Sequence, residues 1–160
     1  YAYWRRKYTQ NKKFQPGAFG ENLSCVGWSE KNVCIGDIFQ LGSSLIQISQ
    51  PRSPCFKLDY HFGITDFALL LQSIGYLGYL FRVIETGNIK NGQNLELKDR
   101  LYPELTVARV SQLYFNESHN IEFLYELHEC RALSKSWKAK VVKRLETGQV
   151  ENRDSRLCPK

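Results

Sequence analysis

The chain has 160 residues, of which 42% are hydrophobic and 24% charged, a composition that supplies a folded core and excludes an intrinsically disordered protein. No apolar run approaches the roughly 18 residues that cross a bilayer, so we expect a soluble protein without a membrane partner. Five scattered cysteines favour reduced thiols and therefore a cytoplasmic protein. The formal net charge is +6, and residues 131–160 hold all of the excess with nine Lys/Arg and three Asp/Glu, which indicates two modules with different partners.

The chain opens with an aromatic segment. Residues 1–8, YAYWRRKY, predict a helix, and a polar loop with Pro16 follows. The sequence contains no Met, so we expect the natural protein to have a further segment upstream.

Recurrent glycines divide residues 17–100 into short apolar segments, a pattern typical of β structure. Three segments predict strands: residues 44–50, residues 78–87, which we expect to be buried, and residues 93–100. One helix interrupts them, with Thr65 as its N-cap and Gly75 just beyond its end. Several short strands separated by turns favour a barrel or a sandwich.

After Pro103 the spacing of apolar residues becomes helical. Three segments predict helices: residues 105–115, which begin extended, residues 118–130, and residues 134–148, with Ser134 as N-cap and Gly148 as the stop. We therefore expect an α+β protein, divided into a mainly β-barrel domain over 1–103, a three-helix domain over 104–149 and a tail over 150–160.

Cys55 lies in a stiff and positively charged loop. Pro51 and Pro54 fix their own φ angles and push their predecessors toward extended geometry. Arg52 and Lys57 would favour the thiolate over the thiol and so lower the pKa of Cys55. Such a thiolate suits a nucleophile, a redox centre or a soft-metal ligand. A buried packing cysteine beside two surface charges explains the same residues.

The remaining cysteines are weaker candidates. Their spacing includes no C-x-x-C pair and no Cys/His cluster, which argues against a disulfide framework or a zinc site. We expect Cys34 to lie in the core and Cys158 in a mobile tail.

Five short motifs together resemble the MOSC domain family, the C-terminal domains of molybdenum cofactor sulfurases, and within it the YiiM type, in which a small three-helix domain follows. They are FGENL (19–23), VCIGD (33–37), SQPRSPCFKL (49–58), HFG (61–63) and TVARV (106–110). Each motif alone is weak, but the proline-flanked cysteine combined with FGENL is specific.

The resemblance implies a β-barrel domain in which Cys55 binds molybdenum or carries sulfur to the molybdenum cofactor. It also implies reduction of N-hydroxylated compounds, such as N-hydroxylated purines, with that cofactor. Two parts seen in other family members do not occur in this sequence: an upstream His-Gly-Gly-Pro-like motif and a pyridoxal-phosphate desulfurase domain. The chain is therefore not expected to extract sulfur from cysteine by itself.

The anionic, phosphate-bearing cofactor suggests roles for residues around Cys55. Arg52 would make a bidentate phosphate contact, and Lys57 would add a point charge. Asn22 would orient the pterin ring, or else stabilise a turn. We expect Glu21 to tie a loop or pair with an arginine rather than titrate.

Two further residues are open to either interpretation. His61 would shuttle protons, because its ordinary pKa lies near neutrality, or serve as a hydrogen-bonded structural histidine. Arg82 needs an anion, such as the cofactor, if it points inward from its apolar strand, and it points to solvent otherwise.

The segment 134–148 has five basic residues on what we expect to be its exposed surface: Lys135, Lys138, Lys140, Lys143 and Arg144. This pattern suits a solvated helix face, the docking of an acidic electron-donor redox protein, or nucleic-acid binding. Lysine steers partners better than it reads bases, so we consider a nucleic-acid partner unlikely.

Two classes of function remain. The chain is a molybdenum-cofactor-dependent reductase that acts on a small-molecule substrate, with Cys55 as metal ligand. Alternatively, it is a non-catalytic carrier of the cofactor, or of sulfur as a Cys55 persulfide.

Overall fold

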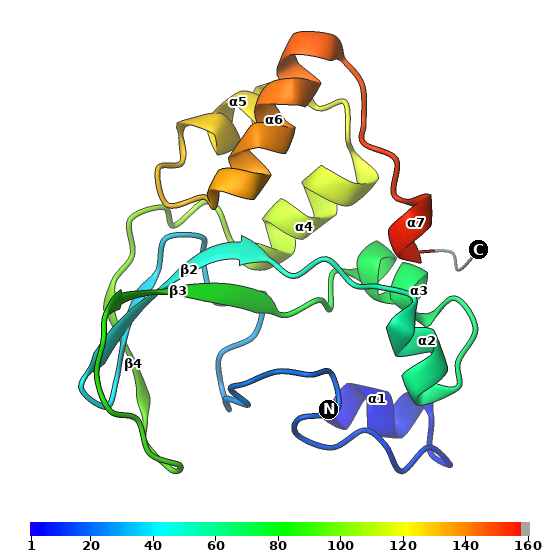
Figure 1. The fold of residues 1–160 in the computed structure, drawn as a ribbon, viewed down its shortest axis with the longest axis vertical. Coiled ribbons are helices and arrows are strands. Elements are labelled where there is room, and N and C mark those ends of the chain that lie inside the picture. The colour runs from blue at the N-terminus through cyan, green and yellow to red at the C-terminus, as the bar shows by residue number, and fades with distance from the viewer. Residues whose placement is uncertain (158–160) are drawn as a thin grey trace.

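Four antiparallel strands form the central sheet of the computed structural model, which describes residues 1–157. The strands are β1 (Ile38–Leu41), β2 (Ser44–Pro51), β3 (Tyr79–Glu85) and β4 (Leu95–Asp99). Their order across the sheet is β3-β2-β1-β4. Longer helices lie on one side of the sheet, and short helices lie beyond one end of its strands (Figure 1). The α+β class and the three predicted strands are confirmed.

The sheet is open, because within residues 1–157 the outer strands β3 and β4 each pair on one side only. A closed barrel is therefore not confirmed. The prediction that residues 78–87 are buried is wrong: only Tyr79 and Phe81 of β3 are partly buried, and Val83 is 62% exposed. The physical reason is the position of β3 at the edge of the sheet, where the described part of the chain leaves one flank uncovered.

A tight hairpin joins β1 to β2, with Leu41 opposite Ser44. Its first turn residue, Gly42, has φ of 60°, and a Cβ there would lie 2.3 Å from the Asn88 carbonyl oxygen. A side chain at this position would therefore both strain the backbone and clash. The same loop is fixed to the rest of the sheet by a 3.1 Å hydrogen bond from Ser43 N to that carbonyl.

Three short helices lie at one end of the sheet: α1 (Ala2–Lys7), α2 (Lys57–Phe62) and α3 (Phe67–Ile74). Helix α1 confirms the aromatic start, whereas α2 is not predicted from the sequence. The N-cap of α3 is Asp66, not Thr65. The first N–H groups of α3 have no partner within the helix. The Asp59 carboxylate on the preceding helix accepts a 2.7 Å hydrogen bond from one of them, Ala68 N.

Three longer helices follow: α4 (Val107–Asn116), α5 (Ile121–Glu129) and α6 (Lys135–Thr147). Thr106 pairs with Cys34 as an extended residue and then caps α4, which confirms the predicted change from extended to helical. Ser134 caps α6 through a 3.2 Å bond from Trp137 N, and Gly148 ends it at φ of 65°. Both predicted signals are confirmed.

One hydrophobic core joins these helices to the sheet. Phe39 and Ile48 from the strands belong to the same buried cluster as Val110, Trp137 and Val141 from the helices. The two parts are therefore packed on each other rather than linked loosely, and the boundary near residue 103 stays a prediction. Among the described residues, no helix has the length and apolar character that crossing a membrane requires.

Arg144 corrects the prediction of a fully exposed basic face on α6, because its side chain is only 2% exposed. Its guanidinium lies 3.6 Å from the centre of the Tyr114 ring. It donates to both Glu151 carboxylate oxygens, at 2.8 and 2.9 Å, and to the Tyr114 carbonyl at 2.9 Å. This buried ion pair turns the chain back toward α4 after Gly148.

The segment 150–157 therefore does not leave the fold as a free tail. After the ion pair, Arg153 donates to the carbonyl of Phe115 at 3.1 Å, and the last helix, α7 (Asp154–Leu157), ends beside α3 (Figure 1). Cys158, predicted to lie in a mobile tail, falls outside the described residues.

Glu151 provides a pH-dependent test of this arrangement. Burial works to raise its pKa, but hydrogen bonds from Arg144 and Tyr114 outweigh it and lower the pKa from 4.5 to about 2. Because the folded pKa is depressed, the stabilisation is complete above pH 4.5 and is lost as the pH falls toward 2. We expect Glu151→Gln to lower the free energy of unfolding at pH 7 by about 3 kcal/mol.

Denaturant unfolding of the parent protein and of Glu151→Gln, from pH 7 to pH 3, measures the difference in their free energies of unfolding. This difference must become smaller as the pH falls. Glu96→Gln is the matched control, since Glu96 pairs with Lys98 at 3.0 Å on the surface and should contribute little. A difference that stays constant with pH would contradict the assignment.

Candidate functional site

Glu21, in the FGENL motif, holds the loop that carries Asn22. Its carboxylate accepts hydrogen bonds from Gly17 N at 2.7 Å, Phe19 N at 3.1 Å and Ser24 Oγ at 2.8 Å, and from the Tyr1 hydroxyl. The predicted loop-tying role is confirmed. Burial works to raise the pKa of Glu21, yet these donors keep it below its ordinary value. Burial and the bond to Glu21 raise the pKa of Tyr1 to about 12.

Cys55 lies in the connection from β2 to α2. At the start of this connection, Arg52 N donates to the Gly78 carbonyl at 3.0 Å. At its end, the Cys55 carbonyl accepts from Leu58 N at 2.9 Å as α2 begins. The structure therefore holds Cys55 in an ordered loop, where the residue as a whole is half-buried.

A cleft of about 1080 Å³ opens between the loop of residues 16–31 and the sheet. The loop is fixed across the cleft by two bonds: Gly78 N donates to Glu30 at 2.8 Å, and the Tyr79 hydroxyl donates to the Trp28 carbonyl at 2.9 Å. Burial, and then the nearby Cys25, Glu30 and Asp37, raise the pKa of Tyr79. Both aromatic and polar side chains therefore face this space.

Two of the predicted site residues, Asn22 and Arg52, line the cleft together. Cys55 itself is not among the lining residues, although the preceding residue, Pro54, is. The fold therefore brings Arg52 and Pro54 of the Cys55 loop to the wall of the cleft. Cys55 follows a wall residue in the sequence but does not itself line the cleft.

Three other predicted residues lie elsewhere. Lys57 is exposed at the start of α2, and His61 is exposed near its end with its ring against Phe62. Arg82 is exposed on β3 and donates to the Ala132 carbonyl, so it joins the sheet to the segment before α6. Catalytic or cofactor-binding roles for these residues stay predictions.

Sequence reasoning missed the residues that shape the far wall of the cleft, Trp28, Glu30 and Tyr79. Trp28 is fixed by a 3.1 Å bond from its indole nitrogen to the Leu95 carbonyl. The sequence signal for them was weak: Trp28 and Glu30 follow a glycine in a loop. Local periodicity does not distinguish such a loop from a solvent-exposed turn.

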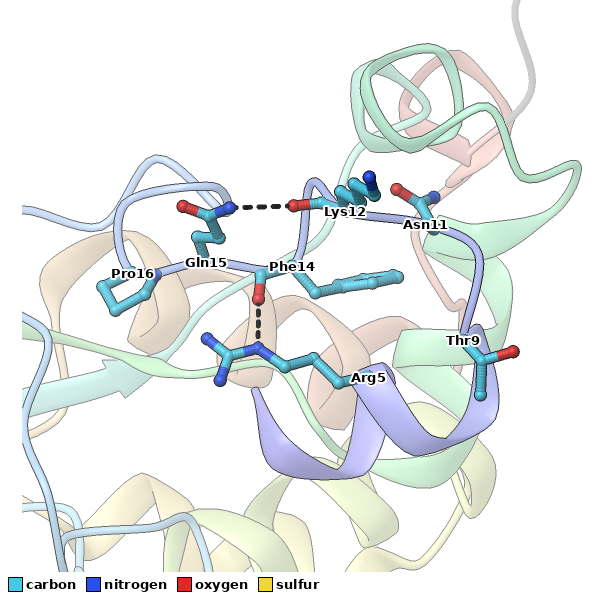
Figure 2. Close-up of a pocket in the computed structure, with 7 residues that line it drawn as sticks. All are labelled: Arg5, Thr9, Asn11, Lys12, Phe14, Gln15 and Pro16. Carbon is cyan, nitrogen blue, oxygen red and sulfur yellow. Dashed lines mark hydrogen bonds between the residues drawn. The ribbon is translucent and has the colours of Figure 1, made fainter.

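A second, smaller hollow of about 420 Å³ lies beside α1. Figure 2 shows that Arg5 donates to the Phe14 carbonyl across it, at 2.7 Å, and that Gln15 donates to the Lys12 carbonyl, at 3.1 Å. These bonds hold the loop after α1 against the helix. None of the predicted site residues lines this hollow, so the larger cleft is the candidate site.

The cysteines differ in access. Cys34 and Cys130 are 1% and 0% exposed, and burial raises the pKa of each thiol. The expectation that Cys34 lies in the core is confirmed. Cys25 is exposed and lines the cleft, and Cys55 is half-buried. Within residues 1–157, no three His, Cys, Asp or Glu side chains gather as a metal-binding group.

Comparison with known proteins agrees with this arrangement. Residues 1–96 match the MOSC domain, and residues 105–148 match the YiiM-like, 3-alpha helix domain. The chain therefore belongs to the MOSC domain family and has the two-part organisation of its YiiM-like members.

Two relatives match over most of this chain. Protein YiiM of Escherichia coli (strain K12) is 41% identical over all of this chain and 71% of its own length. Its crystal structure superposes with a TM-score of 0.93 over 98% of this chain and 78% of that one. The protein YflK of Bacillus subtilis (strain 168) is 38% identical over 90% of this chain and 64% of its own length.

A longer fungal relative is also similar. A reductase of Gibberella moniliformis (strain M3125 / FGSC 7600) is 38% identical over 71% of this chain, which corresponds to 20% of that protein. This chain thus matches only a small part of the fungal protein.

Thiol alkylation tests the geometry of the site. We expect iodoacetamide to modify Cys25 and Cys55 in the native protein, because neither residue is fully buried. Burial raises the pKa of the Cys25 thiol and slows its reaction near neutral pH. Cys34 and Cys130 should react only after unfolding, since each is buried. Mass spectrometry of the digested protein, with a denatured sample as control, gives the rate at each site. Modification of Cys34 as fast as Cys25 would contradict the structure.

Proposed function

We propose that this chain binds the molybdenum cofactor and reduces N-hydroxylated compounds, such as N-hydroxylated purines, with Cys55 as the molybdenum ligand. The observation that supports this most directly is the half-buried Cys55 thiol in an ordered loop, one residue from the wall of a large cleft that Arg52 also lines. The MOSC family match and the fungal reductase relative support the same reaction class.

The residues present suit such a cofactor. A thiolate is a soft ligand, which molybdenum accepts, and Arg52 offers the planar fork that binds a phosphate in two places. Asn22 lies on the same cleft and offers both a donor and an acceptor to a pterin ring. When bound, the cofactor would supply a metal centre that passes electrons to the substrate.

The reaction requires an external reductant. Converting an N-hydroxyl group to N–H takes up two electrons and two protons and releases one water molecule. We propose that an acidic electron-donor redox protein supplies the electrons and docks on the lysines of α6. Since Arg144, Arg153 and Arg156 are engaged within the fold, the outward positive charge of this region is mostly lysine, which suits electrostatic docking.

A carrier function is the second candidate. The partial exposure of Cys55, outside the cleft wall, favours transfer of sulfur to or from a partner protein. In that case Cys55 would hold a persulfide, and the chain would perform no reduction itself.

Metal analysis of protein purified from cells that make the cofactor separates the two candidates. We expect about one molybdenum per chain in the parent protein and a loss of at least tenfold in Cys55→Ser, together with loss of donor-dependent reduction of an N-hydroxylated purine. Cys34→Ala is the matched control, because Cys34 is buried and does not line the cleft, and it should keep the metal. A persulfide on Cys55 without molybdenum would favour the carrier.

Neutralising three lysines tests the docking proposal. We expect Lys138→Gln, Lys140→Gln and Lys143→Gln together to slow donor-dependent turnover several-fold at low salt and to have less effect at moderate salt, because screening weakens steering. Circular dichroism checks folding, and binding to unrelated DNA duplexes is measured in parallel. Sequence-specific DNA binding that the same changes abolish would overturn the proposal.

A further inference from the structure

The end of the described chain reaches the Cys55 loop from about 100 residues away in the sequence. Phe56 N donates to the Arg156 carbonyl at 2.9 Å, and the Arg156 guanidinium donates to the Pro54 carbonyl. One residue thus bonds to the backbone on both sides of Cys55.

The same guanidinium is fixed on its other side. Its second terminal nitrogen donates to the side-chain oxygen of Gln72 at 2.6 Å, and Gln72 is a buried residue of α3. Arg156 therefore bridges α3 to the Cys55 loop. A forked guanidinium makes both bonds at once in a fixed geometry, which a flexible ammonium does not.

Arg156 is itself held in place by the C-terminal segment. Arg153, one helical turn earlier, donates to the carbonyls of Tyr114 and Phe115 on α4. Its guanidinium lies 5.1 Å from the centre of the Phe115 ring, and that of Arg156 lies 5.8 Å from the same ring. The position of Arg156 is therefore defined by the three-helix part of the chain.

The charge around Arg156 agrees with a place close to the thiol. Burial and the neighbouring Arg153 lower the pKa of Arg156, while Cys55 acts in the opposite direction. The bonds from Phe56 N and to the Pro54 carbonyl place Arg156 beside Cys55 in the same way.

We propose that Arg156 is a positioning residue for Cys55: it fixes the backbone on both sides of the thiol and couples the three-helix part of the chain to the site. The inference rests on the proposed function of Cys55, but the clamp itself is a property of the loop. A loop fixed in this way presents its sulfur in one geometry and loses little entropy when it binds a ligand.

Amide hydrogen exchange at Phe56, followed by NMR in the full chain, tests the clamp. We expect Arg156→Ala to lower the protection of this amide about tenfold, because a hydrogen bond from a charged donor is lost beside it. Arg156→Lys should restore part of the protection, since its ammonium reaches one acceptor rather than two. Gln72→Ala should lower it about threefold.

Ser155→Ala is the matched control, because Ser155 is exposed on the same helix and should leave exchange at Phe56 unchanged. Thermal unfolding of each variant separates local from global effects. Unchanged protection in Arg156→Ala, or an equal loss in Arg156→Lys and Arg156→Ala, would overturn the clamp.

Molybdenum content is measured on the same variants. We expect it to fall in the order of the exchange results, with Arg156→Ala lowest. Loss of Phe56 protection in Arg156→Ala with no molybdenum in any protein would uphold the clamp and overturn the reductase proposal. Molybdenum in the parent protein, together with unchanged exchange at Phe56 in Arg156→Ala, would support the reductase proposal and overturn the clamp.

Discussion

The buried ion pair between Arg144 and Glu151 determines the path of the chain after the last long helix, α6. A guanidinium at 2% exposure must be paired, because an isolated charge in the core would cost several kcal/mol. Glu151 and the Tyr114 carbonyl provide the partners, and the Tyr114 ring covers the planar face of the guanidinium. The chain after α6 therefore turns back across α4 instead of leaving the helices.

The path of residues 150–157 across α4 also fixes the Cys55 loop. Once Glu151 is fixed, Arg153 and then Arg156 are brought to α4 and α3 in turn, and the Cys55 loop is bonded by a residue from the far end of the sequence. The loop is already stiffened at its start by two prolines and by the bond from Arg52 N to Gly78. Local rigidity and a distant anchor thus act on the same few residues.

The remainder of the site is arranged by similar long-range bonds. Glu21 accepts hydrogen bonds from its own loop. Gly78 and Tyr79 donate hydrogen bonds that fix the loop of residues 16–31 to the sheet. The result is a cleft whose wall includes Asn22 and Arg52 but leaves Cys55 next to it. Lys57, His61 and Arg82 do not line this cleft. Lys57 and His61 are exposed on helix α2, and Arg82 extends from the edge strand β3 to the Ala132 carbonyl.

The sequence by itself determined the α+β class, the strand at residues 44–50, the capped helix from Ser134 to Gly148, the loop-tying role of Glu21 and the place of Cys34 in the core. Each of these depends on local signals: turn residues, caps and periodicity. Only the tertiary structure decided the exposure of β3, the burial of Arg144 and the return of residues 150–157. Those features depend on which surfaces neighbouring elements cover and on charge pairs between distant residues, and a basic residue at the right helical spacing has the same sequence pattern whether it faces solvent or a buried carboxylate.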